Sequence, residues 1–178
     1  MIGISATPVG ALPEDLQIDL AVEAGDWPDG ARLEDLTRAA VAAAFRNAPL
    51  RTLPGSELSL VFLDDDGIRA LNRSWRNKDK PTNVLSFSGG DAVGGRYGPM
   101  LGDIVLSSDT LAREAKEQGI SFCDHFSHLV VHGLLHLFGY DHQIEAEAEI
   151  MEGLERRILA DLGIADPYAG DPLTADKD

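Results

Sequence analysis

Four of the five histidines of this chain lie in the segment HLVVHGLLHLFGYDH, residues 128 to 142. His132 and His136 are four residues apart, so on a helix their rings share one face and can bind the same ion. Gly139 can adopt the left-handed conformation that ends a helix, which would turn His142 back toward the same place. We therefore predict that His132, His136 and His142 bind one metal ion.

Three histidines leave a tetrahedral zinc ion with one open position, which is typical of a hydrolytic site rather than a structural one. His128 lies on the same helical stripe but is about 12 Å from His136 along the axis, so both cannot bind one ion. Cys123 is about 13 Å from His132 by the same measure and is not expected to be a ligand. For His128 and His125 we predict a structural or supporting role.

Two other interpretations of the histidine cluster exist. Core histidines with hydrogen-bonded partners are the simplest, but they do not account for three residues at this spacing around a glycine. The pattern H-x-x-x-H-x-x-G-x-x-H also resembles that of metzincin peptidases, which carry Glu directly after the first histidine as general base. This chain has Gly133 there. A peptidase is therefore disfavoured, while metal hydroxide chemistry without that base stays open.

A local group of basic residues stands out in an acidic chain. Fifteen Lys and Arg against thirty Asp and Glu give a formal net charge of −15, which opposes nonspecific binding to nucleic acids. Residues 69 to 80 nevertheless carry five basic residues and one acidic residue. Beside a zinc site, such a strip would attract a phosphodiester and stabilise its developing charge; the alternative is a solvated helix face. The candidate substrate-binding residues are Arg69, Arg73, Arg76, Lys78 and Lys80.

Two carboxylates are candidates for supporting the site. Asp103 lies inside an otherwise apolar strand, where a carboxylate is costly unless it pairs with a basic residue or orients a ligand. Asp141 directly precedes the third histidine and could hold a ligand in place. For both residues, a functional role and purely structural pairing are equally open.

The elements that position these residues follow from hydrophobic periodicity and capping signals. Their predicted order, β-α-β-α-β-β-α-α-α, indicates an α+β fold in which helices cover a small mixed four-stranded sheet and the histidine helix is central. We expect a flexible leader at 1–14, one metallohydrolase domain at 15–163 and a flexible tail at 164–178. Strands are predicted at 16–22, 57–63, 82–87 and 100–106, and helices at 31–48, from 64 through 75, at 109–118, at 121–138 and after the histidines.

Several protein classes are excluded by composition. The single cysteine, Cys123, cannot form an intrachain disulfide, which suits a cytoplasmic protein. No Lys or Arg precedes Arg32, so the start of the chain does not read as a signal peptide. The longest segment without a charged Asp, Glu, Lys or Arg, from His125 to Tyr140, is too short to span a membrane. We expect no association with membranes.

With these motifs, the chain resembles the YbeY family of bacterial metal-dependent endoribonucleases, which act in ribosomal RNA maturation. The resemblance rests on LNRSWRNKDKPTNVLSF (71–87), LGDIVLS (101–107) and HGLLHLFGYDH (132–142), and it covers about residues 55 to 160. It implies a zincin-like α+β fold in which His132, His136 and His142 hold one zinc ion. It also implies that Arg76 serves catalysis or substrate binding.

The resemblance further implies a hydrolase specific for single-stranded RNA, acting in small-subunit ribosomal RNA maturation and ribosome quality control. Its partners would be ribosomal RNA, the small ribosomal subunit and the assembly proteins of that subunit. The alternative is a non-catalytic ribosome-assembly factor with a structural zinc, which would carry a protein ligand in the fourth position. Two features depart from the family pattern: Asn83 stands where Asp is common, and the glycine-rich loop 88–99 is longer than usual.

Overall fold

The four strands form one mixed sheet in a computed structural model that describes residues 12–169. In spatial order they run β1-β2-β4-β3, with β1, β2 and β4 parallel and β3 an antiparallel edge strand. This confirms the predicted α+β fold with a small mixed sheet. The strands are β1 (Gln17–Val22), β2 (Glu57–Leu63), β3 (Val84–Ser88) and β4 (Met100–Ser107).

Within residues 12–169 five helices pack on the two faces of the sheet, and side-chain or glycine caps mark the ends of several of them. Asp64 Oδ1 accepts a hydrogen bond from the Gly67 amide at the start of the second helix, and Ser121 Oγ accepts one from the Asp124 amide at the start of the fourth. Gly119 ends the third helix with φ 70°. The helices are α1 (Gly30–Asn47), α2 (Asp65–Arg76), α3 (Ser108–Gln118), α4 (Phe122–Leu137) and α5 (Glu145–Asp161).

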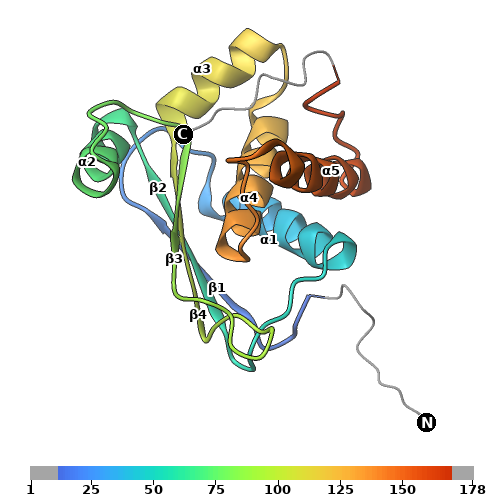
Figure 1. Ribbon diagram of the computed structural model, residues 1–178. Coiled ribbons are helices and arrows are strands. Elements are labelled where there is room, and N and C mark those ends of the chain that lie inside the picture. Colours follow the sequence, from blue (N-terminus) through green and yellow to red (C-terminus); the bar gives the residue numbers. More distant parts are fainter. Residues whose placement is uncertain (1–11, 170–178) are drawn as a thin grey trace.

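The two faces of the sheet carry different helices. Side chains alternate along each strand, so Leu60 and Phe62 of β2 enter the main core under α1, α4 and α5, whereas Leu63 enters a smaller cluster with Ile68 of α2. Figure 1 shows α2 on one side of the sheet and α1, α4 and α5 on the other. Helix α4 contacts α1, α3, α5, β3 and β4, which confirms that the histidine helix is central.

Gly133 sets how closely α4 approaches the sheet. A Cβ atom there would lie 2.9 Å from Ile104 Cγ2 and 3.1 Å from Ser86 Oγ. Ser86 Oγ also donates a hydrogen bond of 3.0 Å to the Gly133 carbonyl. The position at which a metzincin peptidase carries its glutamate is therefore packed against β3 and β4, with no room for a larger side chain.

The C-terminal end of the described region differs from the prediction, whereas the N-terminal end does not test it. Most of the predicted leader lies outside the described residues. Residues 164 to 169 fall in the predicted tail, yet Ile164 packs against the core and Tyr168 is only 5 % exposed. The folded domain thus extends past its predicted boundary. Among residues 12–169, no helix is long and apolar enough to cross a membrane.

Candidate metal centre

A cleft of about 1010 Å³ lies beside the exposed edge strand β3. It is lined by residues of β3, by the end of α2, by α3 and α4, and by the segment that follows α5. Four histidines of α4 and His142 contribute to its walls. The cleft is large enough for a small ligand or part of a polymer.

His132, His136 and His142 meet at one point of this cleft. The Nε2 atoms of His132 and His136 are 3.2 Å apart. The His142 ring centroid lies 5.4 Å from that of His132 and 5.0 Å from that of His136. Gly139, with φ 88°, ends the helix and turns the chain back, as predicted. One ligand atom from each histidine lies within 4.8 Å of the other two.

This geometry suits a zinc-sized ion. Two ligands at about 2.0–2.1 Å from a tetrahedral ion are separated by about 3.3 Å, close to the observed distance between the two Nε2 atoms. Burial, together with the neighbouring His132 and His142, lowers the pKa of His136 to about 4. His136 is therefore neutral at pH 7, with a lone pair available for an ion. No fourth His, Cys, Asp or Glu within residues 12–169 joins this group.

Glu155 of α5 orients the first histidine from behind. Its Oε2 lies 3.0 Å from His132 Nδ1, and its Oε1 lies 2.6 Å from His128 Nε2. Because a carboxylate only accepts, His132 donates through Nδ1 and keeps the lone pair of Nε2 for the ion. The side chain of Glu155 is fully buried. Burial alone would raise its pKa, but the hydrogen bonds from His128 and His132 lower it below the usual value, so the group is ionised.

Tyr168 completes the surroundings of Glu155. Its hydroxyl donates a hydrogen bond of 2.6 Å to Glu155 Oε1, and burial together with that carboxylate raises the pKa of the phenol. This hydrogen bond and the packing of Ile164 against the main core hold the segment after α5 on the domain instead of leaving it as a tail. Residues 162–169, LGIADPYA, are too few for a periodic pattern to indicate this packing.

His128, His132 and Glu155 form a second group whose atoms could hold a metal. The distances of 2.6 and 3.0 Å, together with the Tyr168 hydroxyl on the same carboxylate, fit hydrogen bonds in a network that supports His132. His128 therefore has the supporting place that the sequence predicted.

Glu114, His125 and Asn83 also line the cleft and form a separate hydrogen-bonded group. His125 Nε2 lies 2.8 Å from Glu114 Oε1, which also accepts a 3.0 Å hydrogen bond from Asn83 Nδ2. Burial would raise the pKa of Glu114, but the hydrogen bonds from His125 and Asn83 lower it. Asn83, where the family commonly has Asp, is thus a donor to a carboxylate here.

Arg76 is the one arginine or lysine among the described residues that line the cleft. The other members of the basic segment, Arg69, Arg73, Lys78 and Lys80, do not line it. Arg69 instead pairs with Asp79 at 2.8 Å on the surface. Arg69 and Arg73 are exposed to solvent, and within α2 only Trp75 and Arg76 line the cleft. A role of the other four in binding substrate remains a prediction.

The two predicted carboxylates have different surroundings. Asp141 lines the cleft and accepts a 2.8 Å hydrogen bond from the backbone amide of His142, so it steadies the turn that carries the third histidine. Asp103 lies in an otherwise apolar strand but is exposed, so solvent satisfies its carboxylate. Its neighbour Ile104 faces the main core and α4, so Asp103 points to the opposite face and does not line the cleft.

Sequence reasoning missed Glu155, although a signal was present. Residues Met151, Leu154 and Ile158, spaced three and four apart, form a buried apolar stripe on α5. Glu155 lies four residues after Met151 and three before Ile158, on the same face. A lone acidic residue on an apolar helical stripe indicates a buried partner, here two histidines.

Comparison with known proteins identifies relatives of this chain. The family model "Endoribonuclease YbeY" matches residues 23–163. A protein named Endoribonuclease YbeY from Allorhizobium ampelinum is 53 % identical over 161 residues, covering 87 % of this chain and 96 % of its own length. One of the same name from Rhizobium meliloti is 52 % identical over 164 residues, covering 88 % and 97 %.

A solved structure shares the fold at low sequence identity. The solution structure of TM1509 from Thermotoga maritima matches with a TM-score of 0.52 and 22 % identity, over 85 % of this chain and 99 % of that one. The mixed sheet and the histidine helix thus define an α+β protein with a candidate metal centre. The sequence matches identify the family within this class. The chain belongs to the endoribonuclease YbeY family, as its motifs had indicated.

Proposed function

We propose that this chain is a metal-dependent endoribonuclease that hydrolyses single-stranded RNA, with one zinc ion held by His132, His136 and His142. The observation that carries the proposal is the meeting of these three histidines in an open cleft that also contains Arg76. Relatives more than half identical carry the name Endoribonuclease YbeY. When bound, a divalent ion supplies Lewis acidity toward a phosphoryl oxygen.

The residues of the chain have distinct roles in this proposal. Arg76 donates hydrogen bonds to phosphate oxygens through its planar guanidinium and stabilises the charge that develops on them. Glu155 fixes the ring orientation of His132, and burial keeps His136 neutral. Asp141 holds the backbone of His142 in its turn.

The biological setting is proposed on the family resemblance. The substrate would be ribosomal RNA, cleaved during maturation of the small subunit and in ribosome quality control. The partners would be the small ribosomal subunit and the assembly proteins of that subunit, in the cytoplasm. The single cysteine and the acidic composition are compatible with that compartment.

The alternative is an assembly factor in which zinc is only structural. A structural zinc is usually enclosed by four protein ligands. Here the three histidines are half-buried and line a cleft, and no fourth such side chain within residues 12–169 joins them. This arrangement supports the enzyme over the scaffold.

The proposal is tested by loading the protein with zinc and offering a labelled RNA as a single strand and as its duplex. We expect cleavage of the single strand and little of the duplex. His136→Ala should lose both bound zinc, measured by mass spectrometry of the native protein, and cleavage. Thermal unfolding of the variant shows that it is folded. Undiminished cleavage by metal-free wild type would contradict the proposal.

A further inference from the structure

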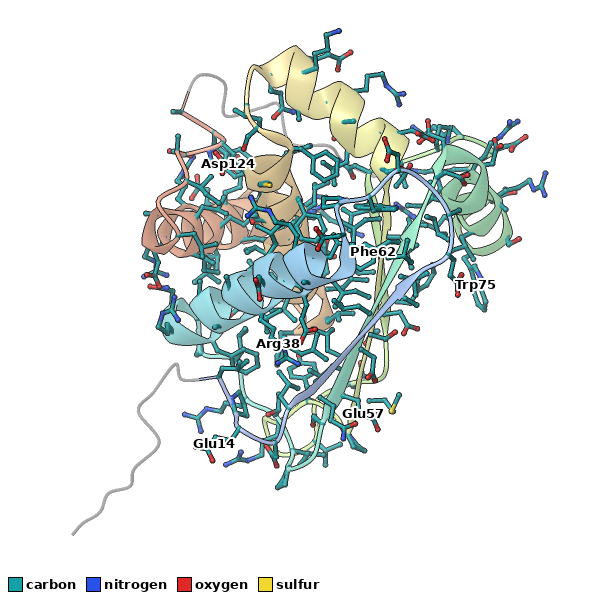
Figure 2. The ribbon with its side chains drawn as sticks, turned by 180° about the vertical axis from the view of Figure 1, so that it is seen from behind. Glu14, Arg38, Glu57, Phe62, Trp75 and Asp124 are labelled. Atoms are coloured by element: carbon teal, nitrogen blue, oxygen red, sulfur yellow. The ribbon has the colours of Figure 1, made fainter. Side chains whose placement is uncertain are left out.

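Trp75 exposes 71 % of its side chain although tryptophan usually buries most of its large apolar surface. It is the second-last residue of α2, directly before Arg76. Trp27, the other tryptophan, packs against Phe62 and donates its Nε1–H to the Leu63 carbonyl. In Figure 2 the labelled Trp75 side chain projects from the end of α2 at the periphery of the molecule.

The exposed ring is nevertheless held in place. Phe87 of β3 contacts it with ring centroids 6.0 Å apart and an interplanar angle of 65°. Phe87 packs in turn against the small core cluster that includes Leu85 and Val105. An edge contact of this kind braces the indole and leaves most of its surface in solvent. A fixed aromatic ring loses little conformational entropy when a flat ligand covers it.

Trp75 and Phe87 both line the cleft that contains the histidines. Most exposed large apolar side chains within residues 12–169 lie away from it. These are Val22, Val93, Met100, Ile144 and Ile150. The exposed ring of Trp75 thus lies in the same cleft as Arg76, where it can contact a bound substrate.

The charges of the side chains that line the cleft indicate that RNA binding needs contacts to groups other than the phosphates. One arginine, Arg76, lines it together with four carboxylates. An RNA backbone entering this cleft meets more negative than positive side chains, so phosphate contacts alone would bind it weakly. Stacking of bases on aromatic rings is the other main source of affinity for single strands. The four carboxylates are Glu114, Asp124, Asp141 and Asp166.

We propose that Trp75 is a stacking platform for one nucleobase of a single-stranded RNA, next to the phosphate that Arg76 binds. The inference rests on the proposed function in taking RNA as the substrate class. Stacking on an indole accepts any base but requires that the base be unpaired, since a duplex hides its base faces. Trp75 therefore provides a physical reason for a preference for single strands.

The test measures binding by zinc-loaded wild type, Trp75→Phe, Trp75→Ala and the control Val93→Ala. Val93 is also 71 % exposed but does not line the cleft. The probes are a short 2′-O-methyl RNA and the same backbone without bases. Gel analysis after each binding measurement checks that both probes are intact. We expect the RNA to quench tryptophan fluorescence and Trp75→Ala to bind it about tenfold more weakly, with partial recovery in Trp75→Phe. The abasic strand should bind wild type and Trp75→Ala equally.

Several outcomes would overturn the stacking platform. One is an unchanged Kd for the RNA in Trp75→Ala, and another is equal quenching by the abasic strand. Absence of RNA binding by wild type would overturn it as well. Failure of the proposed function looks different: RNA binding and quenching persist, but zinc-loaded wild type does not cleave. Cleavage with unchanged binding in Trp75→Ala would refute stacking alone.

Discussion

At the scale of single residues, the carboxylate of Glu155 lies fully buried between two histidines and a tyrosine. A buried carboxylate is costly unless each oxygen has a hydrogen-bond partner. Here Oε2 accepts from His132, and Oε1 accepts from His128 and Tyr168. The hydrogen bond from His132 that satisfies the buried charge also sets the tautomer of this candidate metal ligand, so we expect stability and metal affinity to depend on the same carboxylate.

The variant Glu155→Gln separates these contributions. Its amide can accept from only one histidine, and its NH₂ group faces a second N–H donor, so the orientation of His132 is lost. We expect zinc affinity to fall about 10- to 100-fold, measured by competition with a chromophoric chelator. Glu149→Gln, exposed on the same helix, is the matched control and should bind zinc like wild type. Equal affinities of the two variants would show that Glu155 does not orient the ligand.

Arg76 and Arg73 form a second matched pair. Both are in the last turn of α2, but only Arg76 lines the cleft. We expect Arg76→Ala to lower kcat/KM for RNA cleavage about 10²- to 10³-fold, because a positioned donor to the reacting phosphate is lost. Arg76→Lys should recover only part of this, since Lys lacks the planar fork. A comparable loss in Arg73→Ala would instead assign the effect to the general charge of the helix.

At the scale of elements, the site depends on how closely α4 packs on the sheet. Gly133 lets the helix backbone approach Ile104 and Ser86, and Gly139 ends the helix where His142 must return. Gly133 has no side chain on the face of α4 that packs against the sheet. The histidines of α4 can therefore lie next to β3. A small residue contributes to the site without facing it.

Two glycine-to-alanine changes in helices should have opposite effects on the free energy of unfolding. Gly133→Ala should lower it by about 1–3 kcal/mol, because the new Cβ overlaps a buried isoleucine. Gly153→Ala in α5, where a Cβ meets nothing within 4 Å, should raise it by about 0.5–1 kcal/mol through helix propensity. Urea unfolding of both variants measures the difference. Stabilisation by Gly133→Ala would mean that α4 can move away from the sheet.

At the scale of the whole molecule, the charge is unusual for a protein that binds RNA. The chain has a formal net charge of −15, and one arginine lines its cleft. Few phosphates can be neutralised, so few counterions are released on binding. Affinity for RNA should then depend on the bound metal, on Arg76 and on contacts to bases.

This predicts a weak dependence of RNA binding on salt. For one or two phosphate contacts to a single strand, the slope of log K against log salt is about −0.7 to −1.4. Measuring Kd for a single-stranded RNA between about 50 and 200 mM KCl determines it. A slope of −4 or steeper would show that the basic residues outside the cleft, such as Lys78 and Lys80, also contact the backbone.

The sequence was sufficient for those features that depend on local patterns. Periodicity and caps located all nine helices and strands of residues 12–169, and the spacing around Gly139 located the three histidines. It was insufficient where a side chain's direction depends on the packing of two elements. The face of β4 that carries Asp103 and the direction of the arginine stripe on α2 are examples. The place of Glu155 on the apolar stripe of α5 indicates a buried partner, but the partners themselves lie on α4 and after α5, where local patterns do not identify them.

The hydrogen bond from Tyr168 to Glu155 means that the candidate metal centre depends on a residue beyond the last helix of the described region. Helix α5 ends at Asp161, and Tyr168, whose hydroxyl binds the carboxylate behind His132, comes seven residues later. A shortened protein designed to stop just after α5 would keep every helix and strand. It would nevertheless open a buried carboxylate to water and loosen His132, so fusion tags and truncations should leave residues 162–169 intact.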